Sequence, residues 1–157
     1  MRPRSVLVLM GFLAASFGAA ALGGWATASS VGTWFVTLNK PPWNPPSWLF
    51  GPVWSVLYTL MAIAAWRVWR HADSPDRSIA LRLFVAQLAL NALWSWLFFG
   101  QRRPDLALMN IVLLLLLLIA VQSRFWRIDG IAAWLWAPYL AWVCFASALN
   151  ASIWWLN

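Results

Sequence analysis

The sequence predicts an all-α membrane protein, a single domain of residues 1–157 built as a bundle of five transmembrane helices with a long ordered loop between helices 1 and 2. The first observation is composition: the chain is 63% hydrophobic and 10% charged, whereas soluble domains carry about 25% charged residues. The second is five uncharged blocks, each able to supply the roughly 20 residues that a membrane helix needs: residues 5–39, 41–66, 83–101, 106–123 and 130–157. The third is that these blocks are continuously apolar, unlike the alternating strands of a membrane barrel.

The expected helices have approximate bounds of 5–23, 46–69, 78–99, 104–125 and 129–154. The first follows Arg2 and Arg4, and its alternative is a signal peptide cleaved near residues 26–28. A retained helix is the better interpretation, because its apolar stretch is longer than the roughly 7 to 15 residues of the apolar region of a signal peptide. A small residue at every fourth position also gives it a face for close packing: Gly11, Ala15, Ala19 and Gly23.

The segment that leads into the second helix is rich in proline and tryptophan. Residues 34–58 hold five prolines and four tryptophans around Lys40. The prolines exclude regular helix until they end, and the tryptophans make a solvated linker improbable. We therefore expect an ordered loop that lies over the mouth of the bundle and offers aromatic walls to a flat apolar ligand.

Polar and aromatic residues share faces on three helices. One face of the third helix, spaced by four, four and three residues, is expected to point inward: Gln87, Asn91, Ser95 and Phe98. Matching stripes run along the second helix (Trp54, Tyr58, Met61, Ala65) and along the fifth (Pro138, Trp142, Phe145, Leu149). The fourth and fifth helices start at residue types that suit a helix N-terminus: Pro104 with Asp105, and Asp129.

The fifteen tryptophans are too many for the membrane interfaces alone. Those near expected helix ends are assigned to the interfaces: Trp25, Trp66, Trp69, Trp126, Trp154 and Trp155. Those in the loop or on the inward stripes suit stacking against a planar ligand, although packing alone also accounts for Trp94: Trp43, Trp48, Trp54, Trp94 and Trp142. Three amides are expected to join helices by hydrogen bonds: Asn110, Gln122 and Asn150.

Positive charge is distributed unequally between the two ends of the expected bundle. One end carries Arg2, Arg4, Arg67, Arg70, Arg77, Arg82, Arg124 and Arg127, and the other carries Lys40, Arg102 and Arg103. This asymmetry predicts a multi-pass protein of the bacterial inner membrane, with the N-terminus cytoplasmic and the C-terminus outside. The net charge of +7 does not indicate a nucleic-acid partner, because these residues flank the spans and form no contiguous basic face. Membrane lipid is the expected contact.

Several chemistries are disfavoured. Cys144 and His71 are each the only residue of their type, so no metal site and no cofactor are expected. Cys144 is expected to be buried. The carboxylates all fall in loops or at helix starts, which disfavours an ion-coupled transporter.

Motifs in order along the chain resemble those of one known family. They are residues 39–46, 53–54, 57–61, 87–95 with 98–99, 138–142, 145–146 and 149–150. Together they resemble the signature of the tryptophan-rich sensory protein, or translocator protein (peripheral benzodiazepine receptor), family, over essentially the whole chain. Because several spaced motifs agree, the resemblance is specific.

The resemblance implies a five-helix bundle, often a homodimer, whose pocket under the first loop accepts porphyrins, haem-related tetrapyrroles, sterols and synthetic ligands. It implies that Trp54 and Trp142 act in porphyrin binding and in light-dependent porphyrin breakdown. It also implies pocket or lid positions for Trp43, Phe50, Tyr58, Asn91 and Ala146. No Lys or Arg follows Tyr139, unlike the sterol-recognition pattern of animal members, which argues against cholesterol as the natural ligand.

We therefore expect an integral membrane receptor or sensor that binds porphyrins and related tetrapyrroles inside the bundle. The expected ligand-binding residues are Trp43, Phe50, Trp54, Tyr58, Asn91, Trp94, Phe98, Pro138, Trp142, Phe145 and Ala146. Lys40 either meets the carboxylates of the ligand at the water boundary or serves as a plain surface charge. The alternatives are a light-dependent porphyrin-degrading enzyme, with Trp54 and Trp142 as its catalytic residues, and a facilitator of tetrapyrrole or lipid transport.

Overall fold

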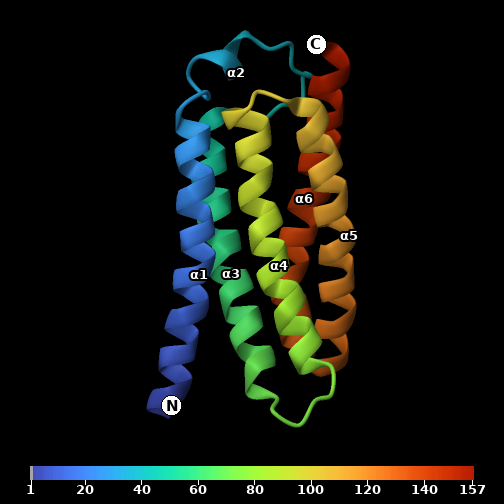
Figure 1. The fold of residues 1–157 in the computed structure, drawn as a ribbon. Helices are drawn as coiled ribbons and strands as arrows, with labels where there is room; N and C mark the ends of the chain where they lie inside the picture. Colours follow the sequence, from blue (N-terminus) through green and yellow to red (C-terminus); the bar gives the residue numbers. More distant parts are fainter. Residues whose placement is uncertain (1) are drawn as a thin grey trace.

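The computed structural model describes residues 2–157, and five long helices form an elongated bundle in this part of the chain (Figure 1). They are α1 (Pro3–Ala28), α3 (Phe50–Arg70), α4 (Arg77–Ser95), α5 (Pro104–Ile128) and α6 (Gly130–Leu156). All five, with short extensions of α3 and α4, are long and apolar enough to cross a membrane. The two termini lie at opposite ends of the bundle, as an odd number of spans requires. The predicted all-α membrane fold is confirmed.

Three short elements complete the chain. The helix α2 (Trp34–Thr37) and the 3₁₀ turn η1 (Ser47–Leu49) lie in the long loop between α1 and α3. The π-helical turn η2 (Trp96–Gly100) continues α4, and its wider winding places the adjacent rings of Phe98 and Phe99 both inside the bundle. Arg102, at φ 54°, then turns the chain back into α5.

The helix ends differ from the sequence prediction by a few residues. The helix α1 continues past Gly23 to Ala28, because no proline interrupts residues 24–28, and a paired glycine weakens a helix without ending it. The expected start of the second helix at Pro46 is too early. Pro46 has an extended backbone, and the chain makes the η1 turn before α3 begins at Phe50.

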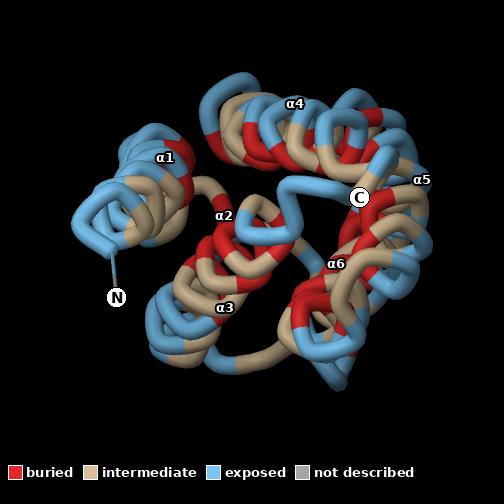
Figure 2. Tube along the Cα trace, turned by 90° about the horizontal axis from the view of Figure 1, so that it is seen from below, coloured by how far each residue is buried: buried red, intermediate tan, exposed pale blue. Residues whose placement is uncertain are grey.

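The half of the bundle nearest the N-terminus has a filled core. Trp136 is 0% exposed and packs against Phe84, Phe125 and Tyr139, with ring centroids 6.0, 5.2 and 5.2 Å apart. Its indole N–H donates to the carbonyl of Leu118 at 3.2 Å. Viewed from this end, α3, α4, α5 and α6 turn buried faces toward one another, while α1 lies at the edge with most of its surface exposed (Figure 2).

The loop between α1 and α3 is ordered and covers the opposite end of the bundle, where Figure 1 shows it reaching the C-terminus. Phe35 is 4% exposed and packs against Phe98 and Phe99. Asn39 and Asn157 exchange hydrogen bonds of 3.0 and 2.9 Å between backbone and side-chain amides. The predicted ordered cap is therefore present, and it is tied to the end of α6.

The expected joining role of three amides agrees with their hydrogen bonds. Asn110 donates to the carbonyl of Leu90 at 2.9 Å, and Gln122 donates to that of Ala133 at 3.1 Å. Asn150 donates to the carbonyl of Pro104 at 2.9 Å. Each bond links two different helices, and it removes a polar group from contact with hydrocarbon.

The expectation that Cys144 is buried is wrong. Cys144 is exposed, because it lies on the outer face of α6, between the inward-facing residues Val143 and Phe145. In a membrane-spanning helix an outward position contacts lipid, so an apolar thiol is tolerated there without being packed inside.

Asp129 connects α5, α6 and α3 at the end of the bundle that carries the N-terminus. Its side chain accepts hydrogen bonds from the backbone N–H groups of Ile131 and Ala132 and so caps α6. Arg67 and His71 place side-chain nitrogens 2.9 and 3.3 Å from its other oxygen. Burial raises the pKa of Asp129, but these hydrogen bonds and the charge of Arg67 outweigh it and hold the pKa below its ordinary value.

Replacing Asp129 by Asn is expected to reduce stability by about 1 kcal/mol at neutral pH, because the cap is kept while the ion pair is lost. A carboxylate whose pKa is lowered by folding contributes stability above its unfolded pKa, near 4, and loses that contribution as the pH falls through the lower folded value. Thermal melting of purified protein between pH 7 and pH 3 should therefore show a smaller acid-induced drop for Asp129→Asn than for the wild type. The control is Asp73→Asn, which replaces an exposed carboxylate between α3 and α4. If Asp73→Asn reduced the acid-induced drop as much as Asp129→Asn does, the ion pair of Asp129 would not be the cause.

Candidate functional site

A cavity of about 490 Å³ lies in the half of the bundle under the loop. Residues from all five long helices and from the loop line it. Its volume falls within the range of roughly 300–1,000 Å³ that is typical of small-molecule sites. No charged side chain is among its lining residues, so this is a neutral, mainly apolar chamber.

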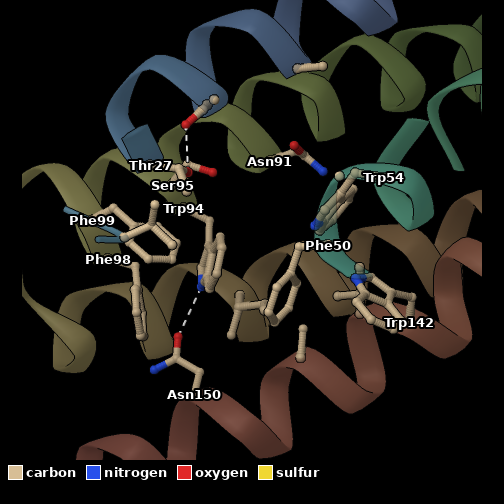
Figure 3. A pocket seen from close by; sticks show the side chains of 18 of the residues that line it. Thr27, Phe50, Trp54, Asn91, Trp94, Ser95, Phe98, Phe99, Trp142 and Asn150 are labelled. Atoms are coloured by element: carbon tan, nitrogen blue, oxygen red, sulfur yellow. Dashed lines mark hydrogen bonds between the residues drawn. The ribbon is translucent and has the colours of Figure 1, made fainter. Parts of the chain in front are cut away.

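Aromatic side chains form a large part of the wall (Figure 3). Phe50 and Trp142 meet edge to face with centroids 6.1 Å apart, and Trp54 lies 5.5 Å from the ring of Tyr58. Trp94 stacks on Phe98 at 5.2 Å. These rings come from α3, α4, η2 and α6, so the cavity offers flat faces on several sides.

A hydrogen bond fixes the orientation of Trp94. Its indole N–H donates to the side-chain oxygen of Asn150 at 2.9 Å, as the dashed line in Figure 3 shows. Asn150 in turn donates to the carbonyl of Pro104 at 2.9 Å. The two bonds join α4, α6 and the start of α5, and they hold the indole plane in the cavity wall.

A chain of buried hydrogen bonds lies at the inner end of the cavity. The Tyr58 hydroxyl donates to Asn91 at 2.5 Å, and Asn91 donates to the Tyr139 hydroxyl at 2.8 Å. Tyr139 donates to Gln87 at 2.8 Å. Tyr58 and Asn91 face the cavity, whereas Tyr139 and Gln87 are fully buried beyond it. The site therefore combines apolar walls with one polar end that can orient a ligand.

The structure brings most of the expected binding residues together in the cavity wall: Phe50, Trp54, Tyr58, Asn91, Trp94, Phe98, Trp142, Phe145 and Ala146. Trp43 and Pro138 do not line it. Trp43 is 46% exposed, and its ring lies 5.6 Å from that of Phe145, because the loop carries it above the chamber. Pro138 is exposed on α6, since Tyr139 rather than Pro138 points inward at that level.

Lys40 is used to shape the loop. Its ammonium group donates to the carbonyls of Phe35 and Leu38 at 2.8 and 2.9 Å, and it lies 4.9 Å from the centre of the Phe35 ring. These contacts assign Lys40 a structural role in the loop, whereas the sequence left open a contact with a ligand carboxylate or a plain surface charge. Among the described residues, no group of three His, Cys, Asp or Glu side chains is placed to hold a metal ion.

The small-residue pattern of α1 does not indicate that this helix lines the cavity, and in the loop the sequence points to the tryptophans instead of Val31 and Phe35. Phe17, Gly23 and Thr27 of α1 line the cavity, as do Val31 and Phe35 of the loop. The repeated small residues of this helix were a usable signal for close packing. Such a pattern indicates contact between helices, and a helix that packs along one narrow edge can also form the wall of a chamber.

Comparison with known proteins agrees with the motifs. Residues 11–156 match the TspO/MBR family. The chain is 40% identical over 139 residues to protein CrtK of Rhodobacter capsulatus, a match covering 88% of this chain and 87% of that protein. It is 38% identical over 153 residues to tryptophan-rich protein TspO of Archaeoglobus fulgidus (98% and 99% covered) and 36% identical over 135 residues to the translocator protein of Bos taurus (85% and 80% covered).

Proposed function

Because this chain belongs to the TspO/MBR family, we propose that it is a membrane receptor or sensor that binds porphyrins and related tetrapyrroles in the aromatic cavity. The observation that carries the proposal is the neutral chamber of about 490 Å³ walled by Phe50, Trp54, Trp94 and Trp142. A rigid planar macrocycle presents two broad apolar faces, which match aromatic walls better than they match flexible aliphatic ones.

Burial of these faces supplies the affinity. Each 100 Å² of apolar surface removed from water contributes about 2.5 kcal/mol, part of which is offset by the lost motional freedom of the ligand. The carboxylates of the ligand stay outside the chamber, because its lining holds no charge that would compensate their desolvation. Tyr58 and Asn91 are then left to orient the polar centre or a polar edge of the ring.

Binding of protoporphyrin IX should quench tryptophan fluorescence saturably in the wild-type protein, since several indoles border the cavity. The measurement is a titration in the dark, in detergent and again in lipid nanodiscs. Trp155→Phe, an indole 82% exposed at the end of α6, is the control and should leave the dissociation constant unchanged. Quenching that grows linearly without saturation would contradict the proposed receptor.

Light-dependent porphyrin degradation is the second candidate, and the position of two tryptophans favours it. Trp54 and Trp142 line the same chamber, and the ring of Phe50 lies beside that of Trp142 (Figure 3). In this reading one of the two indoles donates an electron to the light-excited porphyrin, so that the indole becomes a radical cation and the porphyrin a radical anion. Loss of the porphyrin absorption band under illumination, abolished by Trp54→Phe with Trp142→Phe, supports the enzyme. An unchanged band with saturable quenching supports binding alone.

The proposed orientation places the N-terminus in the cytoplasm, because the end of the bundle near it carries most of the arginines. The cavity and its loop then face outward. We also propose a homodimer, on the strength of the family resemblance. The filled core around Trp136 lies between the cavity and the N-terminal end, which argues against a continuous path for transport through the bundle.

A further inference from the structure

The loop covers the end of the cavity, but the cavity is open at the side of the bundle. Six of its lining residues are exposed at the surface, and all of them belong to α1, η1 or α3: Phe17, Gly24, Ala28, Ser47, Gly51 and Ser55. The lining residues from α4, α5 and α6 are buried or half-buried. A residue that borders a cavity and is also exposed marks an edge of its opening. The opening therefore lies between α1 and the start of α3.

The path of α1 explains why the opening lies near the end of α1 and the start of α3. Near its start α1 is held to α3, because the Trp66 indole donates to the carbonyl of Ser5 at 2.9 Å. Near its end α1 contacts α4 and η2 instead. Trp25 meets Trp96 at 5.4 Å, and a Cβ atom on Gly23 would lie only 2.9 Å from the Ser95 hydroxyl. The helix thus leaves α3 as it approaches the cavity.

The edges of the opening are made of small residues. Gly24 and Ala28 border it on α1, and Gly51 and Ser55 border it on α3. A Cβ atom added to either glycine would meet nothing within 4 Å. The lower edge is Phe17, which is 40% exposed and lies 6.0 Å from the ring of Tyr58. The opening faces the lipid, since both helices span the membrane.

We propose that this gap is a lateral portal through which a tetrapyrrole dissolved in the bilayer enters the cavity without passing through water. The inference rests on the proposed receptor function and adds the route of the ligand. The loop closes the approach from the end of the bundle, because Phe35 packs against Phe98 and Phe99, and Asn39 is hydrogen-bonded to Asn157. A flat apolar ligand partitions into the membrane, so a side entrance meets it where it is most concentrated.

The test narrows the portal while leaving the cavity walls of α4, α5 and α6 untouched. Gly24→Phe and Gly51→Phe, one on each edge, are compared with Gly18→Phe, an exposed α1 glycine outside the cavity with nothing within 4 Å of its Cβ position. Purified variants in lipid nanodiscs are mixed with protoporphyrin IX in a stopped-flow instrument, and tryptophan quenching gives the association and dissociation rates.

Both portal variants should slow association by roughly tenfold, because a phenyl ring would narrow the opening, whereas Gly18→Phe should match the wild type. The equilibrium capacity of each variant reports how much of it is folded. Unchanged rates in both portal variants, with saturable binding intact, would overturn the portal and leave the receptor standing. Weaker binding with an unchanged association rate would also overturn it, because the new rings would then occupy the site itself. Absence of saturable binding in the wild type would overturn the receptor and the portal together.

Discussion

Ala146→Trp is expected to raise the dissociation constant for protoporphyrin IX by roughly 100-fold. Ala146 lies on the cavity-facing side of α6, close in sequence to Trp142 and Phe145, and its small side chain leaves the chamber open. An indole at this position fills space that the macrocycle needs. Displacing about 100 Å² of apolar contact at roughly 25 cal/mol per Å² removes about 2.5 kcal/mol of affinity.

The matched control is Ala148→Trp, two residues further along the same helix on its exposed side and outside the cavity. It adds the same side chain and should bind protoporphyrin IX like the wild type. Fluorescence titration gives both dissociation constants, and thermal melting shows whether each variant is folded. If a folded Ala146→Trp protein bound as tightly as Ala148→Trp, the ligand would have to lie elsewhere.

The inward faces of individual helices could be predicted from the sequence because a helix repeats its side chains every three to four positions. The spacing of Gln87, Asn91, Ser95 and Phe98 identified the buried face of α4, and three of these four line the cavity. The same spacing predicts that Trp54 and Tyr58 lie on the inward face of α3, and both line the cavity. The continuous apolar blocks were enough to predict that the chain has five long helices and that each can span a membrane.

Periodicity does not determine how far a face extends along a helix or which neighbour it meets. Pro138 belongs to the same sequence stripe as Trp142, yet it is exposed, and the interior at its level is filled by Tyr139. The buried chain from Tyr58 to Gln87 joins three helices, so no single-helix pattern could reveal it. The side opening depends on the angle of α1, which is set by tertiary contacts such as those of Ser5 and Gly23.

Gly23→Leu is expected to destabilise the protein by about 1–3 kcal/mol, the usual range for forcing extra atoms into a packed contact. A Cβ atom on Gly23 would lie 2.9 Å from Oγ and 3.3 Å from Cβ of Ser95. The far end of α1 must then move away from α4, although leucine has the higher intrinsic helix propensity. Gly24→Leu is the control, because the adjacent glycine has nothing within 4 Å of its Cβ position.

Replacing Ser95 by Gly removes both atoms that Gly23→Leu would strike, so the pair forms a double-mutant cycle. Ser95→Gly alone should cost about 1 kcal/mol through backbone entropy. In the double variant we expect the cost of Gly23→Leu to shrink by at least about 1 kcal/mol, measured by thermal or denaturant unfolding in detergent. Strictly additive costs, or equal losses from Gly23→Leu and Gly24→Leu, would mean that α1 does not pack on α4 through this glycine. The contact that draws α1 away from α3, and with it the physical basis of the side opening, would then be absent.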